Sequence, residues 1–430
     1  MAGKGKSMRL MRLVMMGGWM LLICGAVNGD ALTDAEKQEG FESLFNGKDF
    51  SGWKIMGKAE GWEIVDEAIH AIPGKNGYYI RGERDFEDFI LRLEYKTGAN
   101  ANSGVFIHAP EYGRQSRVGG EIQIFDSYGK EPTPNSAGAI YDVLAPRVTA
   151  SRPTGEWNDL EIHYEYPQIK VTLNNQVVQD VDIRHDDRLR WRIRKGPFGL
   201  QEHGNNAWFR NIRVKDLGGD DTASWESLFN GVDLSGWKME GQAKWSVKKP
   251  GVTIQIKDTR GADITQWSPK LATQDFDLWK QLGNAKIKFN EATIAGADRP
   301  GVLISEKRYK DFQLWAYVKA GVDAEGGLSF HWNGRDDPGY EVKILNDSKD
   351  PNKTGSLVGL APAEGLYAQD AGWFPLQIAV QGQQGWFIVN GKVVAKYDKL
   401  EEKEGNIVLR IDSRSSKILF KDIRIQELKP

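Results

Sequence analysis

The sequence has very little cysteine, little histidine and no long apolar run after its first thirty residues. Cys24 is the single cysteine among 430 residues, and only six histidines are present. One early cysteine excludes a disulfide framework and CxxC redox chemistry in the rest of the chain. Six histidines argue against a multi-histidine metal cage, and the lack of later apolar runs excludes a polytopic membrane protein.

An excess of charge of one sign is also missing. Fifty-seven lysines and arginines face 59 aspartates and glutamates, for a formal net charge of -2. Nucleic-acid-binding domains are usually basic, so we expect no nucleic-acid partner. Glycine and tryptophan are abundant, at 48 and 15 residues. This composition predicts many turns and many flat aromatic faces.

The first thirty residues have the pattern of a secretory leader. Four basic residues come first: Lys4, Lys6, Arg9 and Arg12. An apolar stretch follows at 13–27, so we predict a signal peptide at 1–29, export to the periplasm or cell exterior, and no stable membrane insertion after cleavage. The alternative is an uncleaved anchor, although the stretch is shorter than the roughly 20 residues that span a bilayer. Bulky Ile23 argues against lipid modification of Cys24, but the sequence does not decide whether this cysteine is modified.

The chain contains two copies of one module. Segment 42–54 recurs at 226–238, an offset of 184 residues, with the same ESLFNG and SGWK motifs in both places. Further matches follow in the same order along both copies, which chance does not produce. We therefore predict two homologous domains at 40–217 and 222–430, the second with an insertion near 240–308.

Within each copy, apolar and polar residues alternate with a period of two, as along 89–95. This alternation is typical of half-buried strands. Asn174-Asn175 and Asn390-Gly391 lie at the same place in the two copies and favour the positive φ angles of a tight hairpin turn. We predict an all-β fold of two tandem jelly-roll β-sandwich domains.

The most polar predicted strand is 120–126, with the sequence GEIQIFD. A period of two places Glu121 and Gln123 on one face, and Asp126 joins them only if a bulge intervenes. The spacing is similar to the E-x-D-x-x-E strand of laminarinase-type retaining glucanases. Gln123 replaces the central acid here, which argues against double displacement by two carboxylates. The alternative is a solvated strand face without chemistry.

A second polar strand end carries Gln201 and His203 on one face. Histidine titrates near neutrality, so His203 is a candidate proton carrier. Trp157 is either a platform for a sugar ring or a core residue. No cofactor is implied, but three residues could ligate a divalent cation if the fold brought them together: His108, Glu121 and His203.

Taken in order, the motifs of the first copy resemble the 3-keto-disaccharide hydrolase family, which has a concanavalin-like fold. The matching segments are 44–53, 120–126, 137–141, 155–158, 199–204 and 209–212. The resemblance implies a secreted enzyme acting on glycosides already oxidised at C3. The ketone acidifies the C2 proton, a base removes it, the C1 leaving group departs, and water can then add. This chemistry needs a base, a proton donor and an oxyanion stabiliser.

From these patterns we predict a set of site residues. Glu121 or His203 is the base, with Asp126 as its partner, and Gln123 and Gln201 donate hydrogen bonds to the substrate. Further substrate contacts are expected from His108, Tyr141, Trp157 and Arg152. The alternative is a carbohydrate-binding or adhesive protein without catalysis. Convergence of the titratable side chains on one concave face would favour the enzyme.

The second copy departs from the pattern at most of these positions. Gln123 corresponds to Lys343, and His203 corresponds to Asp412. We therefore expect any activity to belong to the first copy. The sequence does not distinguish a sugar-binding module, a packing partner and a regulatory lid as the role of the second.

Overall fold

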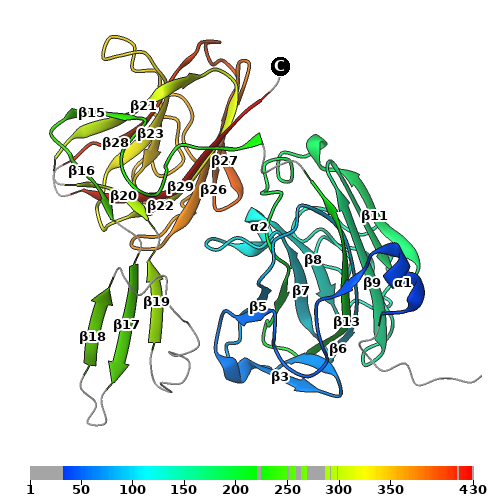
Figure 1. Ribbon diagram of the computed structural model, residues 1–430. Coiled ribbons are helices and arrows are strands. Elements are labelled where there is room, and N and C mark those ends of the chain that lie inside the picture. The colour runs from blue at the N-terminus through cyan, green and yellow to red at the C-terminus, as the bar shows by residue number, and fades with distance from the viewer. Residues whose placement is uncertain are drawn as a thin grey trace, which may run out of the picture.

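The computed structural model describes residues 32–219, 224–248, 251–257, 263–268, 286–290, 292–297, 299–413 and 416–428. The expected signal peptide lies outside these residues. Antiparallel strands dominate the described part and form two β-sandwiches (Figure 1). The prediction of tandem all-β sandwich domains is confirmed.

Two sheets form the first sandwich. The larger one runs β11 (Gln176–Asp182), β10 (Gln168–Leu173), β9 (Trp157–Glu165), β6 (Asp88–Thr97), β13 (Ala207–Gly218), β4 (Ala68–Ala71) and β3 (Trp62–Val65), and β1 (Glu42–Ser43) also pairs with β13. The smaller one runs β2 (Trp53–Ile55), β5 (Tyr79–Gly82), β12 (Gly199–Gln201), β7 (Asn102–Ile107) and β8 (Gly120–Phe125).

The second sandwich repeats this strand order. Its larger sheet runs β16 (Lys244–Lys248), β20 (Thr293–Ala297), β29 (Lys417–Glu427), β22 (Phe312–Ala320), β25 (Phe374–Gln381), β26 (Gln384–Val389) and β27 (Lys392–Tyr397), with β14 (Glu226–Ser227) on β29. Its smaller sheet runs β15 (Trp237–Gly241), β21 (Gly301–Tyr309), β28 (Gly405–Ile411), β23 (Gly326–Trp332) and β24 (Tyr340–Ile344). The two copies therefore share one topology.

Within the expected insertion, the backbone forms a further three-stranded sheet. It consists of β18 (Asp263–Ser268), β17 (Gly251–Lys257) and β19 (Lys286–Asn290). These strands lie in the chain between β16 and β20, the counterparts of β3 and β4. The insertion thus leaves the strand order of the second sandwich unchanged.

Alternation along the strands builds a separate core in each sandwich. In β6, Phe89, Leu91 and Leu93 are buried between the sheets, while Arg92 and Glu94 face outward. Each fully buried side chain of this kind contributes roughly 1.5 to 3 kcal/mol. The predicted hairpin turns join β10 to β11 and β26 to β27, and all four turn residues have positive φ.

The described helices are short. They are α1 (Asp34–Glu39), α2 (Gln115–Val118) and the 3-10 turns η1 (Ala59–Gly61) and η2 (Ile183–His185). Thr33 and Glu36 cap α1 reciprocally, so its first backbone N–H groups are satisfied. In the described part of the chain, no helix is long and apolar enough to cross a membrane.

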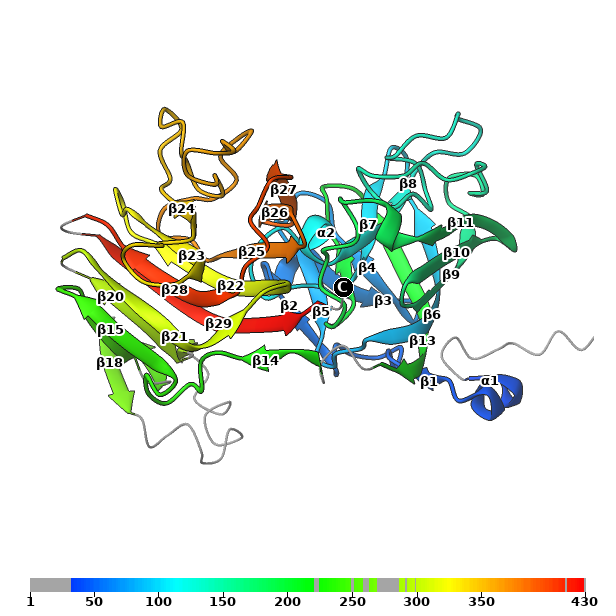
Figure 2. The ribbon, with the colours of Figure 1, turned by 90° about the horizontal axis from the view of Figure 1, so that it is seen from above.

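The second sandwich packs the outer face of its larger sheet against loops of the first. Trp191 contacts Trp386, with ring centroids 5.0 Å apart, and Val118 packs on Trp315. In both ribbon views β26 lies beside α2 (Figures 1 and 2). The turn between β26 and β27 is so close that a Cβ on Gly391 would stand 2.4 Å from the carbonyl carbon of Arg117. The second domain thus braces the segment around α2.

Candidate functional site

A polar pocket of about 230 Å³ lies on the face of the smaller sheet of the first domain. It is lined by Asn102, Phe106, Arg114, Gln115, Ser116, Glu121, Tyr141, Gln201 and His203. Strands β7, β8 and β12 supply the floor, the segment leading into α2 supplies one wall, and Tyr141 comes from the long connection after β8. Four of the predicted site residues therefore meet in one pocket: Glu121, Tyr141, Gln201 and His203.

Glu121 is the most perturbed group of this pocket. Its side chain is only 2 % exposed, and burial raises its pKa from the ordinary 4.5 to about 8, against the opposing attraction of Arg114 and Arg192. Gly104 on the neighbouring strand makes room for the carboxyl group, because a Cβ there would stand 2.1 Å from Oε1 of Glu121. The alternative of a solvated strand face is therefore wrong at this position.

Gln123 lies next to Glu121 and is equally buried, without lining the pocket. In the amide orientation that satisfies both ends of its side chain, its nitrogen donates to Glu121 Oε1 at 3.2 Å and to the carbonyl of Ser103 at 3.0 Å. These contacts suit a residue that positions the carboxyl group of Glu121.

Gln201 ends β12, and His203 follows it two residues later at the pocket. His203 is exposed, and its Nδ1 lies 3.3 Å from Nδ2 of Asn102. The side-chain oxygen Oε1 of Gln201 is buried and has no hydrogen-bond partner among the described residues. A buried acceptor without a partner is costly, so this atom is suited to accept a hydrogen bond from a ligand hydroxyl group.

The structure places Asp126 just beyond the end of β8, outside the pocket lining. Its carboxylate accepts hydrogen bonds from Thr154 Oγ1 at 2.8 Å and from the backbone N–H of Asn100 at 2.9 Å. These contacts join two loops, and the bulge needed to turn Asp126 toward Glu121 is absent from the described pairing of β7 with β8.

Trp157 and Arg152 lie on the outer face of the larger sheet rather than at the pocket. The ring of Trp157 is flanked by Lys96 Nζ at 5.0 Å and the guanidinium of Arg210 at 4.0 Å from its centroid. Arg152 donates to the backbone oxygen of Trp157 and to Asp159. Period-two alternation explains this placement, since Asn158 and Leu160 face inward.

His108 is buried between the two sheets. Its Nε2 lies 2.8 Å from the carbonyl oxygen of Glu87, and burial lowers its pKa to about 4. His331 repeats this contact in the second copy, with the carbonyl of Lys310 at 2.8 Å. The shared geometry in a copy that has lost the polar pocket indicates a structural role for both histidines.

The three candidate cation ligands do not come together. Among the residues that the structure describes, no group of three or more histidine, cysteine, aspartate or glutamate side chains is arranged to hold a metal ion. His108 is buried in the core, whereas His203 is exposed at the pocket.

Sequence reasoning missed the residues around α2. Arg114, Gln115 and Ser116 line the pocket, and the charge of Arg114 opposes the rise in the pKa of Glu121. Their position five to seven residues before Glu121 could have predicted that they lie near it. A short connection between neighbouring strands returns to the same end of the sheet. Without that step, Arg114 is indistinguishable from an ordinary solvated loop charge.

In the second copy, ion pairs replace the polar pocket. Lys343 Nζ lies 3.1 Å from Asp412 Oδ2 and 3.6 Å from Glu341 Oε1. Arg410 Nε lies 3.4 Å from Glu341 Oε2, and Arg410 also pairs with Asp412 at 3.1 Å. The residues that correspond to Glu121, Gln123, Gln201 and His203 therefore neutralise one another.

Comparison with known proteins agrees with this architecture. Residues 40–215 and 224–426 each match the family described as 3-keto-alpha-glucoside-1,2-lyase-like domain. The chain belongs to this family. It is 27 % identical over 244 residues to a 3-keto-disaccharide hydrolase of Bacteroides thetaiotaomicron, covering 45 % of this chain and 83 % of the relative. The expected resemblance and the expectation of a hydrolase-type enzyme are confirmed.

Two solved structures of similar chains each align with less than half of this chain. A putative glycosyl hydrolase from Parabacteroides distasonis is 28 % identical, covers 44 % of this chain and 99 % of its own, and has a TM-score of 0.39. A second putative glycosyl hydrolase from the same organism is 26 % identical, with coverages of 41 % and 99 % and a TM-score of 0.37.

Proposed function

We propose that the first domain processes 3-keto-glycosides, with Glu121 as the base that removes the C2 proton. The observation that carries this proposal is a buried carboxyl group with a pKa raised to about 8 on the floor of a polar pocket. A base with such a pKa accepts a proton more readily than an ordinary carboxylate. It becomes ionised, and so able to act as a base, as the pH rises to mildly alkaline values.

The other pocket residues suit the remaining steps. Removal of the C2 proton by Glu121 leaves an enolate whose negative charge lies on the C3 oxygen, and the Arg114 guanidinium is a cation available to stabilise it. The C1–O bond then breaks, and the leaving oxygen takes a proton, for which exposed His203 is the candidate donor. Gln201 Oε1 accepts a hydrogen bond from a sugar hydroxyl group. Addition of water to the unsaturated sugar completes a net hydrolysis.

Export and a carbohydrate partner belong to the same proposal. The leader pattern at 1–29 supports secretion, and the polar lining of the pocket supports a hydroxylated substrate. Asp126, Trp157, Arg152 and His108 take no direct part in the proposed chemistry, because their side chains contact other parts of the domain.

The test is turnover of a 3-keto-glucoside by the full chain without residues 1–29, with and without a chelator. We expect the loss of substrate and the appearance of an unsaturated or hydrolysed sugar by NMR. Glu121→Gln should lower kcat by about 10²- to 10⁴-fold, the usual contribution of a general base. Glu341→Gln makes the same change at the matching position of the second copy and should leave turnover within about twofold.

Two outcomes would contradict the proposal. One is binding of neutral sugars by the parent protein without any turnover, which favours the carbohydrate-binding alternative. The other is equal activity in Glu121→Gln and Glu341→Gln, which would remove Glu121 from the chemistry.

A further inference from the structure

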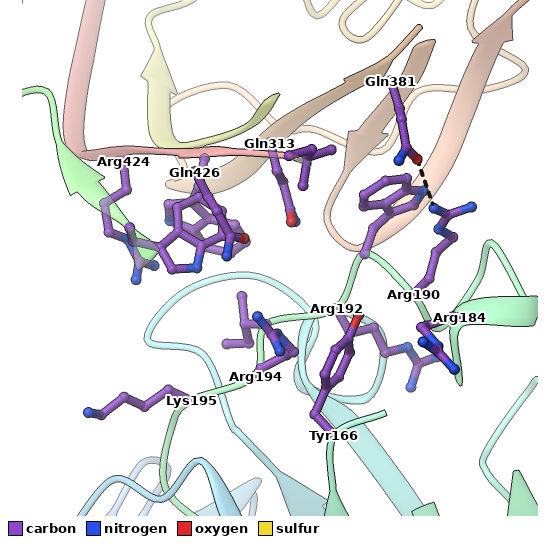
Figure 3. Close-up of a pocket in the computed structure, with 15 residues that line it drawn as sticks. Tyr166, Arg184, Arg190, Arg192, Arg194, Lys195, Gln313, Gln381, Arg424 and Gln426 are labelled. Atoms are coloured by element: carbon purple, nitrogen blue, oxygen red, sulfur yellow. Dashed lines mark hydrogen bonds between the residues drawn. The ribbon is translucent and has the colours of Figure 1, made fainter. Parts of the chain in front are cut away.

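A second pocket, of about 290 Å³, lies where the two domains meet (Figure 3). Its lining holds six basic side chains: Arg184, Arg190, Arg192, Arg194, Lys195 and Arg424. The described lining of this pocket contains no aspartate or glutamate. The pocket shares no lining residue with the polar pocket of the first domain.

The carboxylates that pair with these cations lie outside the pocket lining. Lys195 Nζ is 3.1 Å from Glu87, and Arg424 Nε is 3.0 Å from Asp422 Oδ1. Two further pairs have their carboxylates outside the lining in the same way: Arg184 with Asp182 and Arg190 with Asp187. The contact between Arg424 Nε and Asp422 is an ion pair without the geometry of a hydrogen bond. Among the described residues, the buried N–H group at Nε therefore has no hydrogen-bond acceptor. A ligand in the pocket would therefore meet guanidinium and ammonium groups before any negative charge.

Aromatic rings and amides complete the lining. Tyr166, Trp191, Trp225 and Trp315 contribute rings, and the Arg194 guanidinium lies 3.9 Å from the centroid of Tyr166. Trp191 is 6 % exposed, and its indole Nε1 is buried without a partner in the described structure. Figure 3 shows Gln313 and Gln426 of the second domain facing Arg194 and Tyr166 of the first across the pocket.

We propose that this interdomain pocket binds a negatively charged sugar unit, one that carries a carboxylate or a sulfate ester. Planar guanidinium groups bind the oxygens of carboxylates and sulfates in pairs, and unpartnered N–H groups favour an acceptor-rich ligand. Aromatic rings pack against the C–H face of a sugar, and the volume is near the lower end for small-ligand pockets. The choice of a sugar rests on the proposed function, whereas the choice of an anion rests on the pocket alone.

The test is titration calorimetry on the full chain without residues 1–29, with four probes: D-glucuronate, D-glucose 6-sulfate, D-glucose and inorganic sulfate. At least one acidic sugar should bind, with glucose and inorganic sulfate each at least about tenfold weaker. Arg424→Gln and Arg194→Gln, one from each domain, should each weaken the acidic sugar at least about fivefold. Arg335→Gln removes the same charge from a side chain that is 79 % exposed and should change nothing.

Equal binding of glucose would overturn the anion requirement, and equal binding of inorganic sulfate would overturn sugar recognition. Unchanged affinity in both Arg424→Gln and Arg194→Gln, with parental circular dichroism, would overturn the assignment to this pocket. Turnover of a neutral 3-keto-glucoside should stay within about twofold in Arg424→Gln. Failure of this proposal is therefore distinguishable from failure of the proposed function.

Discussion

Replacing Glu121 by glutamine should change how the stability of the protein depends on pH. In the unfolded chain this carboxyl group ionises near 4.5, whereas in the folded protein burial holds its pKa at about 8. The unfolded state therefore loses the proton first, and the folded state becomes progressively less stable between these two values. The difference between the two pKa values corresponds to roughly 5 kcal/mol, of which about 4 kcal/mol develops between pH 5 and pH 9.

The assay is urea unfolding at pH 5, 7 and 9, followed by tryptophan fluorescence for the parent chain and Glu121→Gln. Because the two domains have separate cores, the transition assigned to the first domain is the one to compare. Relative to the parent, Glu121→Gln should gain roughly 4 kcal/mol of unfolding free energy from pH 5 to pH 9. Glu156→Gln, at an exposed loop position, is the matched control and should follow the parent. Parallel pH profiles for the parent and Glu121→Gln would refute the burial argument.

Other predictions concern activity. Since the proposed base must be ionised, kcat/KM should rise with pH through about 8, and a fall over the same range would make Glu121 an acid instead. Gly104→Ala should cost at least about 10² in kcat, as its Cβ must displace the carboxyl group, whereas Gly327→Ala in the second copy should spare turnover. Gly391→Ala should press on the backbone of Arg117 and lower kcat/KM about tenfold without touching the pocket; parental kinetics would show that the second domain does not brace it.

The sequence was most informative where the fold depends on local periodicity. Alternation along 89–95 specifies which side chains of β6 face the core, and it does so without knowledge of the neighbouring strands. Asn390-Gly391 likewise specifies a turn through its own φ preferences. Glu121 and Gln201 could be placed on polar strand faces for the same reason. The order of the motifs along the chain assigned both residues to the first domain.

What depended on distant neighbours could not be predicted. The burial of Glu121 results from Gly104 on another strand and from the wall around Arg114, so its pKa is a property of the assembled pocket. Trp157 shows the same limit. Alternation predicts that it faces away from Leu160, but only the pairing of sheets shows that this face is remote from Glu121.

The two copies show how one topology can support a pocket or remove it. Both keep a carboxyl group on the same strand, Glu121 in one and Glu341 in the other, with a glycine beside it. In the first copy the neighbouring strand residues Gln123 and Gln201 are uncharged. The attraction of Arg114 and Arg192 does not offset the cost of burial, so the pKa of Glu121 is raised. In the second, Lys343 and Arg410 form ion pairs with Glu341, although burial and the nearby Asp412 raise the pKa of this carboxyl group as well. The second domain has no polar pocket, but the outer face of its larger sheet packs against the segment around α2, beside the pocket of the first domain.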